Sequence, residues 1–359
     1  MKQEGSHRTK FRVMASLLIS LTTCAVVLDA CKKKEQVSVN YNPTYLQLAV
    51  PAGWPQPATN IFKNNPLTEE GFQLGRKLFY DGRLSKDGKY PCASCHQQVA
   101  SFATYDHQLS HGYNDGHTYR NAPGLLNLAW MKELNWDGGS SDLETQPIAH
   151  ITNANEMAET VDNVLKKLSI DSSYKRLFTA AFGDANFTGQ RMLRALAQFT
   201  GSMLAFNSKY DQVKRGEARF TQPEQDGYNT FKAKCNACHA EPLFTDNSYR
   251  NTGLTQDPVL KDSGRMKVTG LAADMYKFRV PGLRNVALTF PYLHDGRLVS
   301  LLQVVEHYRS GIQTSQPTLD ALLKARIILT NEEKVNLVEF LQTLTDNALV
   351  NDARFAQPR

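Results

Sequence analysis

Hydrophobic residues recur at intervals of three and four along much of the chain, which is the spacing of an α-helix with one buried face. The spacing is clearest in two segments, one before residue 170 and one after Thr188: Met157, Val161, Val164, Leu165 and Leu168, then Met192, Leu193, Leu196, Phe199 and Met203. Alternating runs typical of strands are scarce. The pattern therefore predicts a mainly α fold with long loops.

Polar residues mark where two further helices begin. Thr68, followed by two acidic residues, favours a helix that starts there and runs toward Tyr80. Thr221-Gln-Pro-Glu224 is a capping box with proline in the first turn, and it predicts a helix that leads directly into Cys235.

Two more segments are expected in the last third of the chain. Residues 301–308 have helical spacing, and Asn331 is predicted to cap a helix with this inner face: Val335, Val338, Leu341 and Leu344. Residues 278–296 are dense in Pro, Gly, Arg and His, which favours a loop packed against a polar group.

The chain has 359 residues, 41% hydrophobic residues and a net charge of +6. This length can bury a sizeable core and favours two domains. No basic stripe with interleaved aromatic residues is present, so nothing in the sequence indicates a nucleic-acid partner.

The first thirty residues are typical of an export signal. Lys2, Arg8, Lys10 and Arg12 precede an apolar run from Val13 to Leu28, which is too short and too interrupted for a membrane span. Cys31 follows Leu-Asp-Ala and resembles the cysteine of a bacterial lipoprotein box; an ordinary cleaved signal is the alternative. We expect an exported, periplasmic protein, lipid-anchored at Cys31, with a polar, proline-rich linker over 32–60.

One motif, C-x-x-C-H, occurs twice, as Cys92-Ala-Ser-Cys95-His96 and Cys235-Asn-Ala-Cys238-His239. The paired thiols can bind haem through thioether bonds, and the histidine can supply the proximal nitrogen to iron. A zinc site or redox-active dithiols are the alternatives, but paired zinc motifs usually lie ~15–20 residues apart. The sequence therefore favours two covalently bound haem c groups.

Because a helix precedes each motif, the chain contains a weak internal repeat. It predicts two cytochrome c-like haem domains with the haems near the domain junction. The boundaries are residues 1–31 for the export signal, 32–60 for the linker, 61–210 for the first haem domain with the tail 346–359, and 211–345 for the second.

Over residues 60–345 the chain resembles the bacterial dihaem cytochrome c peroxidases and their MauG-type relatives. The resemblance rests on elements in a fixed order: the first C-x-x-C-H, Arg120-Asn-Ala-Pro123, Trp136-Asp-Gly138, Glu156-Met157, the second C-x-x-C-H, Val280-Pro-Gly-Leu-Arg-Asn285 and Tyr292-Leu-His-Asp-Gly296.

The resemblance implies a division of labour between the haems. The haem on His96 would be the peroxidatic one, and the haem on His239 would store and relay electrons by way of Trp136. Calcium at the junction would be held by residues that match the family positions: Asn121, Thr289 and Pro291. Oxygen ligands of this kind suit calcium.

Gln146 and Glu156 match the polar pair over the open face of the first haem. Peroxide must lose a proton from one oxygen and gain one on the other before its O–O bond breaks, and a nearby carboxylate can do both. The resemblance therefore implies that Glu156 is the acid–base group. The sequence alone favours an acid at a helix start that stabilises the helix dipole, and only the resemblance reverses that preference.

The sequence leaves the distal iron ligands open. His111 resembles the histidine that caps the resting first haem in many peroxidases, and His150 stands where relatives commonly carry proline. For the second haem, Tyr308 occupies the slot that holds a tyrosine ligand in MauG-type relatives, and Met275 is the alternative. Gly139 stands where the family often has arginine.

The resulting expectation is a peroxidase that reduces hydrogen peroxide to water. Electrons would come from a small donor such as a cytochrome c. A MauG-type oxidase of a protein side chain and a non-enzymatic electron-transfer cytochrome are the alternatives.

Overall fold

The computed structural model describes residues 41–358. The predicted export signal, the lipid-anchor site at Cys31 and the start of the predicted linker lie outside these residues. The α-helices are α2 (Glu69–Phe79), α3 (Cys92–Cys95), α4 (Gln146–Thr152), α5 (Val161–Ser169), α6 (Ser172–Phe182), α7 (Gly189–Gly201), α8 (Lys209–Lys214), α9 (Gln222–Lys234), α10 (Met266–Thr269), α11 (Leu301–Glu306), α12 (Asn331–Gln342) and α13 (Asn347–Asn351).

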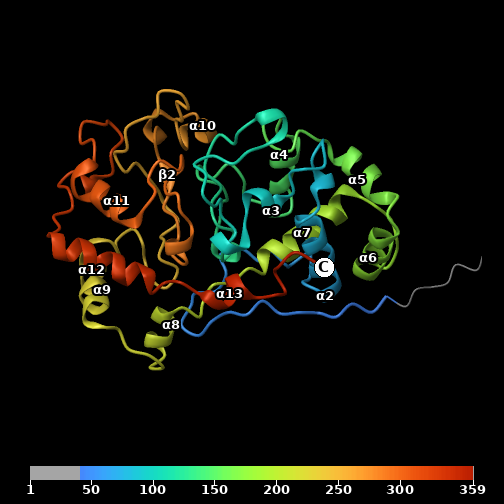
Figure 1. The fold of residues 1–359 in the computed structure, drawn as a ribbon, viewed down its shortest axis with the longest axis horizontal. Coiled ribbons are helices and arrows are strands. Elements are labelled where there is room, and N and C mark those ends of the chain that lie inside the picture. The colour runs from blue at the N-terminus through green and yellow to red at the C-terminus, as the bar shows by residue number, and fades with distance from the viewer. Residues whose placement is uncertain (1–40, 359) are drawn as a thin grey trace, which may run out of the picture. The chain divides into compact units, whose positions relative to one another are not determined.

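Strands contribute little to this fold (Figure 1). Over the described part of the chain, the single sheet pairs β1 (Tyr249–Arg250) with β2 (Phe278–Arg279) in antiparallel register. The loops contain short 3₁₀ turns, and a π-helical turn, η7 (His307–Gly311), follows α11. The mainly α class is confirmed. Among residues 41–358, no helix is long and apolar enough to cross a membrane.

Polar caps set the helix starts. The Thr68 hydroxyl accepts a hydrogen bond from Gly71 N at 3.0 Å at the start of α2, and Thr221 forms the capping box of α9, as predicted. Two residues lie elsewhere in the helices than predicted. Thr330, not Asn331, caps α12, since its capping box closes on Glu333. Met157 precedes α5 but is buried nevertheless.

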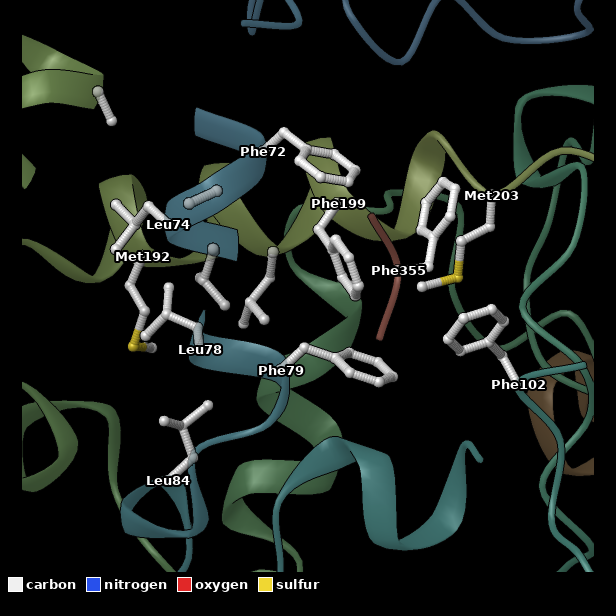
Figure 2. Packing of buried hydrophobic residues seen from close by; sticks show 14 of the residues in the cluster. Phe72, Leu74, Leu78, Phe79, Leu84, Phe102, Met192, Phe199, Met203 and Phe355 are labelled. Carbon is white, nitrogen blue, oxygen red and sulfur yellow. The ribbon is translucent and has the colours of Figure 1, made fainter. Parts of the chain in front are cut away.

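One hydrophobic cluster is built on α2, α6 and α7 (Figure 2). Phe72 and Phe199 pack with ring centroids 5.3 Å apart, and Phe355 from the C-terminal segment lies 5.5 Å from Phe72. Arg76 and Tyr80 of the same region donate hydrogen bonds to the main-chain oxygens of Ala356 and Phe355. The C-terminal segment therefore packs on α2.

A second cluster is built on α9, α11 and α12, and its largest fully buried side chains include Phe231, Phe244 and Phe340. The expected inner face of α12 was partly wrong. Val335 is half exposed, whereas Leu337 and Phe340 are buried, because the helix starts at Asn331 and turns that stripe toward α9. Leu341 and Leu344 are buried as predicted.

The two clusters share one helix-crossing geometry. A Cβ atom added to Gly75 of α2 would lie 1.9 Å from Ala195 O in α7, and one added to Gly227 of α9 would lie 1.9 Å from Asn336 O in α12. In both pairs the next contact along the partner helix is a phenylalanine Cβ, at 2.9 Å. Each helix that precedes a C-x-x-C-H motif thus crosses its partner at a glycine, which gives the internal repeat a physical basis.

Residues 41–60 form no helix or strand, but they are hydrogen-bonded to the rest of the body. Leu46 N donates to Leu67 O, Tyr41 donates its hydroxyl to Ala181 O, and Trp130 Nε1 donates to Pro55 O. This part of the predicted linker is held against the helices. The domain boundaries at 60, 210 and 345 stay predictions.

Candidate functional site

The first C-x-x-C-H motif forms the short helix α3 and ends at His96. His96 is enclosed, and burial lowers the pKa of its imidazole to about 4. Its Nδ1 lies 2.8 Å from Phe102 O. Because a carbonyl only accepts, Nδ1 carries the hydrogen and the Nε2 lone pair remains available as a ligand.

The second motif repeats this arrangement at the end of α9. His239 is buried, which lowers the pKa of its imidazole, and its Nδ1 lies 3.1 Å from Phe244 O and 3.2 Å from Pro281 O. Pro281 belongs to the Arg- and Pro-rich loop. One task of that loop is therefore to fix the ring orientation of His239.

A cavity of about 460 Å³ adjoins the second motif and is lined mostly by apolar side chains. Cys235, Cys238 and His239 line it. Two polar atoms in its wall are buried without a hydrogen-bond partner: Arg279 Nη1 and Asn247 Oδ1. Arg279 is only 5% exposed, and burial lowers the pKa of its guanidinium. A buried cation without a counter-charge is costly, so this cavity favours an anionic group on its occupant.

Tyr308 and Met275 differ in their placement relative to this cavity. Tyr308 lines it from the π-helical turn η7, and burial together with the nearby thiols of Cys235 and Cys238 raises the pKa of its hydroxyl. Met275 is not among the lining residues, and its carbonyl accepts a hydrogen bond from Thr318. Of the two candidates, only Tyr308 faces the cavity that holds the second motif.

A polar network lies beside the first motif. His150 Nδ1 is 2.5 Å from Glu156 Oε2, and His150 Nε2 is 2.7 Å from Gln146 Nε2, one helical turn earlier in α4. Asn153 Nδ2 donates to Glu156 Oε1 at 2.8 Å. The charges of His150 and Glu156 both act on the pKa of His96, which places the network close to the buried imidazole.

His111 lies in an exposed loop. Its ring meets that of His107 edge-on and that of His117 at a tilt, with centroids 4.9 and 4.6 Å away. The neighbouring Tyr113 N donates to Glu156 O at 2.7 Å, so the loop is anchored to the backbone of the network. That His111 caps an iron stays a prediction, and it requires the His111 ring to leave its contacts with His107 and His117.

Trp136 and the expected calcium residues gather at the cavity. Trp136 Nε1 donates to Asn121 O at 2.8 Å, and both residues line the cavity together with Thr289 and Pro291. Asn121 also donates its side-chain Nδ2 to Gln108 O at 3.0 Å. The structure therefore brings these four residues to one cavity.

Comparison with known sequences decides the family. Residues 69–219 match the family described as di-haem cytochrome c peroxidase. The methylamine utilization protein MauG of Methylophilus methylotrophus is 35% identical over 297 residues, which cover 80% of this chain and 85% of the relative. The cytochrome c551 peroxidase of Nitrosomonas europaea is 34% identical over 295 residues, covering 81% and 84%.

The chain belongs to the di-haem cytochrome c peroxidase and MauG family. A solved MauG-like protein associated with microbial copper homeostasis is 34% identical and superposes with a TM-score of 0.76 over 87% of this chain and 99% of that one. The diheme peroxidase BthA of Burkholderia thailandensis shares the fold, with a TM-score of 0.68 at 22% identity over 81% and 90% of the two chains.

Membership of this family implies two c-type haems, and the residues present fit them. Each motif offers two free cysteines and an imidazole whose second nitrogen is fixed by a carbonyl. Haem is largely apolar and carries two carboxylates, which matches an apolar cavity with the unpaired Nη1 of Arg279 in its wall.

Sequence reasoning missed several members of the candidate site. Asn135 accepts a hydrogen bond from Gln146 at 3.1 Å, and Asn153 holds the second oxygen of Glu156. The unpaired atoms of Asn247 and Arg279 were also not singled out. The density of Arg and Pro around Arg279 was the only signal in the sequence, whereas the asparagines have no distinguishing local pattern.

Proposed function

We propose that this protein is a dihaem c-type peroxidase that reduces hydrogen peroxide to water. The observation that carries the proposal is the hydrogen-bonded Gln146–His150–Glu156 network beside His96. A pure electron carrier needs no such acid–base group. Peroxidase relatives such as that of Nitrosomonas europaea support the choice.

A haem held by Cys92, Cys95 and His96 would supply the redox-active iron for cleaving the O–O bond. Glu156 accepts a proton from one peroxide oxygen and returns it to the other, because its carboxylate is held in place by donors on both oxygens. Gln146 is fixed by Asn135 and His150 through its amide nitrogen, which leaves its carbonyl oxygen to receive a peroxide hydrogen.

Electrons enter at the second site and pass by way of Trp136 in this proposal. Trp136 lines the cavity of the second motif, and its neighbour Asn135 holds Gln146 of the first. The donor is a small redox protein such as a cytochrome c, as the names of the peroxidase relatives suggest.

The second candidate function is a MauG-type oxidation of a protein side chain. Tyr308 favours it, because a phenolate facing the second cavity would stabilise oxidised iron and make simple donor-driven reduction harder. The MauG relatives are as similar to this chain as the peroxidases are.

Calcium and membrane attachment are part of the proposal. Asn121, Thr289 and Pro291 line the same cavity and offer the amide, hydroxyl and carbonyl oxygens that calcium prefers. Export to the periplasm and lipidation at Cys31 follow from the charged and apolar N-terminal pattern. Mass analysis of the N-terminal peptide and calcium analysis of purified holoprotein test these two points.

The deciding experiment is peroxide consumption by the holoprotein with a chemically reduced c-type cytochrome. The peroxidase proposal expects oxidation of two donor cytochromes per peroxide with saturation in both substrates. Rapid consumption of peroxide without donor oxidation, together with oxidation of an added protein, would replace it by the MauG-type alternative.

A further inference from the structure

His150 is the member of the distal network that the family resemblance leaves without a role. Both of its ring nitrogens are engaged, Nδ1 with Glu156 Oε2 at 2.5 Å and Nε2 with Gln146 Nε2 at 2.7 Å. An iron ligand needs a ring nitrogen with a free lone pair. The network therefore holds His150 in place for its hydrogen bonds and does not present it as a ligand.

The donors and acceptors of this network fix where the hydrogens lie. The amide nitrogen of Gln146 can only donate, so Nε2 of His150 accepts and Nδ1 carries the ring hydrogen. That hydrogen points at Glu156 Oε2. The other carboxylate oxygen is held by the amide of Asn153, which does not exchange protons as an acid. His150 is thus the one titratable side chain hydrogen-bonded to Glu156 among the described residues.

His150 also lies nearer to solvent than Glu156. Its side chain is 41% exposed, whereas that of Glu156 is 15% exposed. Conversion of one peroxide to two waters consumes two electrons and two protons. Glu156 can transfer a proton between the two peroxide oxygens, but the two additional protons must arrive from solvent.

We propose that His150 is the positioning residue through which Glu156 exchanges protons with solvent, an inference that rests on the proposed peroxide chemistry. In each transfer, Nε2 takes a proton from solvent and Nδ1 gives its own to Glu156 Oε2, so the imidazole changes tautomer and no electron moves. Before the second transfer, loss of the Nε2 hydrogen to solvent and uptake of one at Nδ1 restore the starting tautomer. Uptake at Nε2 requires that this nitrogen exchange its hydrogen bond with the Gln146 amide for one with water.

Two substitutions separate proton transfer from simple orientation. His150→Asn keeps an N–H donor near the position of Nδ1 but cannot carry a proton, and His150→Ala removes both functions. We expect both variants to retain the haem spectra and to lose peroxide turnover by ~10²-fold. Free imidazole should restore much of the rate in His150→Ala. His107→Asn changes an exposed histidine outside the network. It is the matched control and should turn over peroxide at the wild-type rate.

A second readout does not require turnover. Hydrogen cyanide must leave its proton with a neighbouring group when it binds as an anion, so its association rate reports on the same proton path. We expect both His150 variants to bind cyanide more slowly and imidazole to accelerate His150→Ala.

Wild-type rates in His150→Asn would overturn the proposal in favour of orientation alone, and slow variants that imidazole does not rescue would overturn it as well. Should His150→Ala fail to fold, His150→Asn decides. If the wild type consumes no peroxide, the proposed function fails, whereas the cyanide rates still test His150.

Discussion

The main-chain N–H of Arg279 donates a 2.7 Å hydrogen bond to the main-chain oxygen of Trp136. Arg279 Nε also reaches Asn135 O, at 3.3 Å, and the Asn135 side chain accepts a hydrogen bond from Gln146. Two adjacent residues thus connect the polar network near His96 with the cavity near His239. We infer that this short segment sets the geometry between the two haem sites.

Arg279 provides the first prediction. Its buried guanidinium stabilises added negative charge, so Arg279→Met should lower the reduction potential of the second haem, by an amount on the order of tens of millivolts. Arg279→Lys retains the charge and should shift the potential less. Potentiometric titration of both variants is the measurement. An unchanged potential in Arg279→Met would show that the cation does not face the haem.

Tyr308 provides the second prediction. If its oxygen ligates the second iron, Tyr308→Phe should raise the potential of that haem and alter its spectrum, because a phenolate favours ferric iron. Met275→Leu is the matched control and should change neither. A near-infrared methionine–iron band in the wild type, or a changed spectrum in Met275→Leu alone, contradicts the assignment.

The helix crossings provide the third prediction. Gly75→Ala and Gly227→Ala place a methyl group against rigid backbone of the partner helix, so each should lower the free energy of unfolding by about 1–3 kcal/mol. Gly189→Ala is the control within α7, since its nearest neighbour is only a side-chain atom, Val161 Cγ1 at 2.9 Å. Denaturant titration of the holoprotein measures all three. Equal stability of the Gly75 and Gly189 variants would contradict the close crossing.

The helix starts show how much of the fold could be predicted from the sequence. Caps act within four residues, so the starts of α2 and α9 were predictable from Thr68 and Thr221. The N-cap of α12 was predicted at Asn331 but is Thr330, because both residues are good caps. The predicted inner face was displaced as well and did not include Phe340, which is buried.

Some features of the candidate site could also be predicted from the sequence, and others could not. The C-x-x-C-H motifs were readable because their chemistry is local, and Gln146 and Glu156 were found through the family resemblance. The hydrogen bond from His150 to Glu156 and the absence of a partner for Arg279 Nη1 depend on the tertiary packing of segments that are separate in the sequence. Periodicity carries no information about such contacts.

His111 provides the fourth prediction. In the structure its ring is exposed and packs against those of His107 and His117, so we expect the oxidised protein to react with peroxide without prior reduction. His111→Gly should then react at the wild-type rate. A wild type that is inert until the second haem is reduced, together with an active His111→Gly variant, would instead identify His111 as the resting ligand.

The central claim is that Glu156 performs acid–base chemistry on peroxide, and rapid mixing of peroxide with Glu156→Gln tests it most directly. The variant should keep both haems and their reduction by donor, yet react with peroxide ~10²-fold or more slowly than the wild type. A variant that reacts with peroxide at close to the wild-type rate would contradict the account.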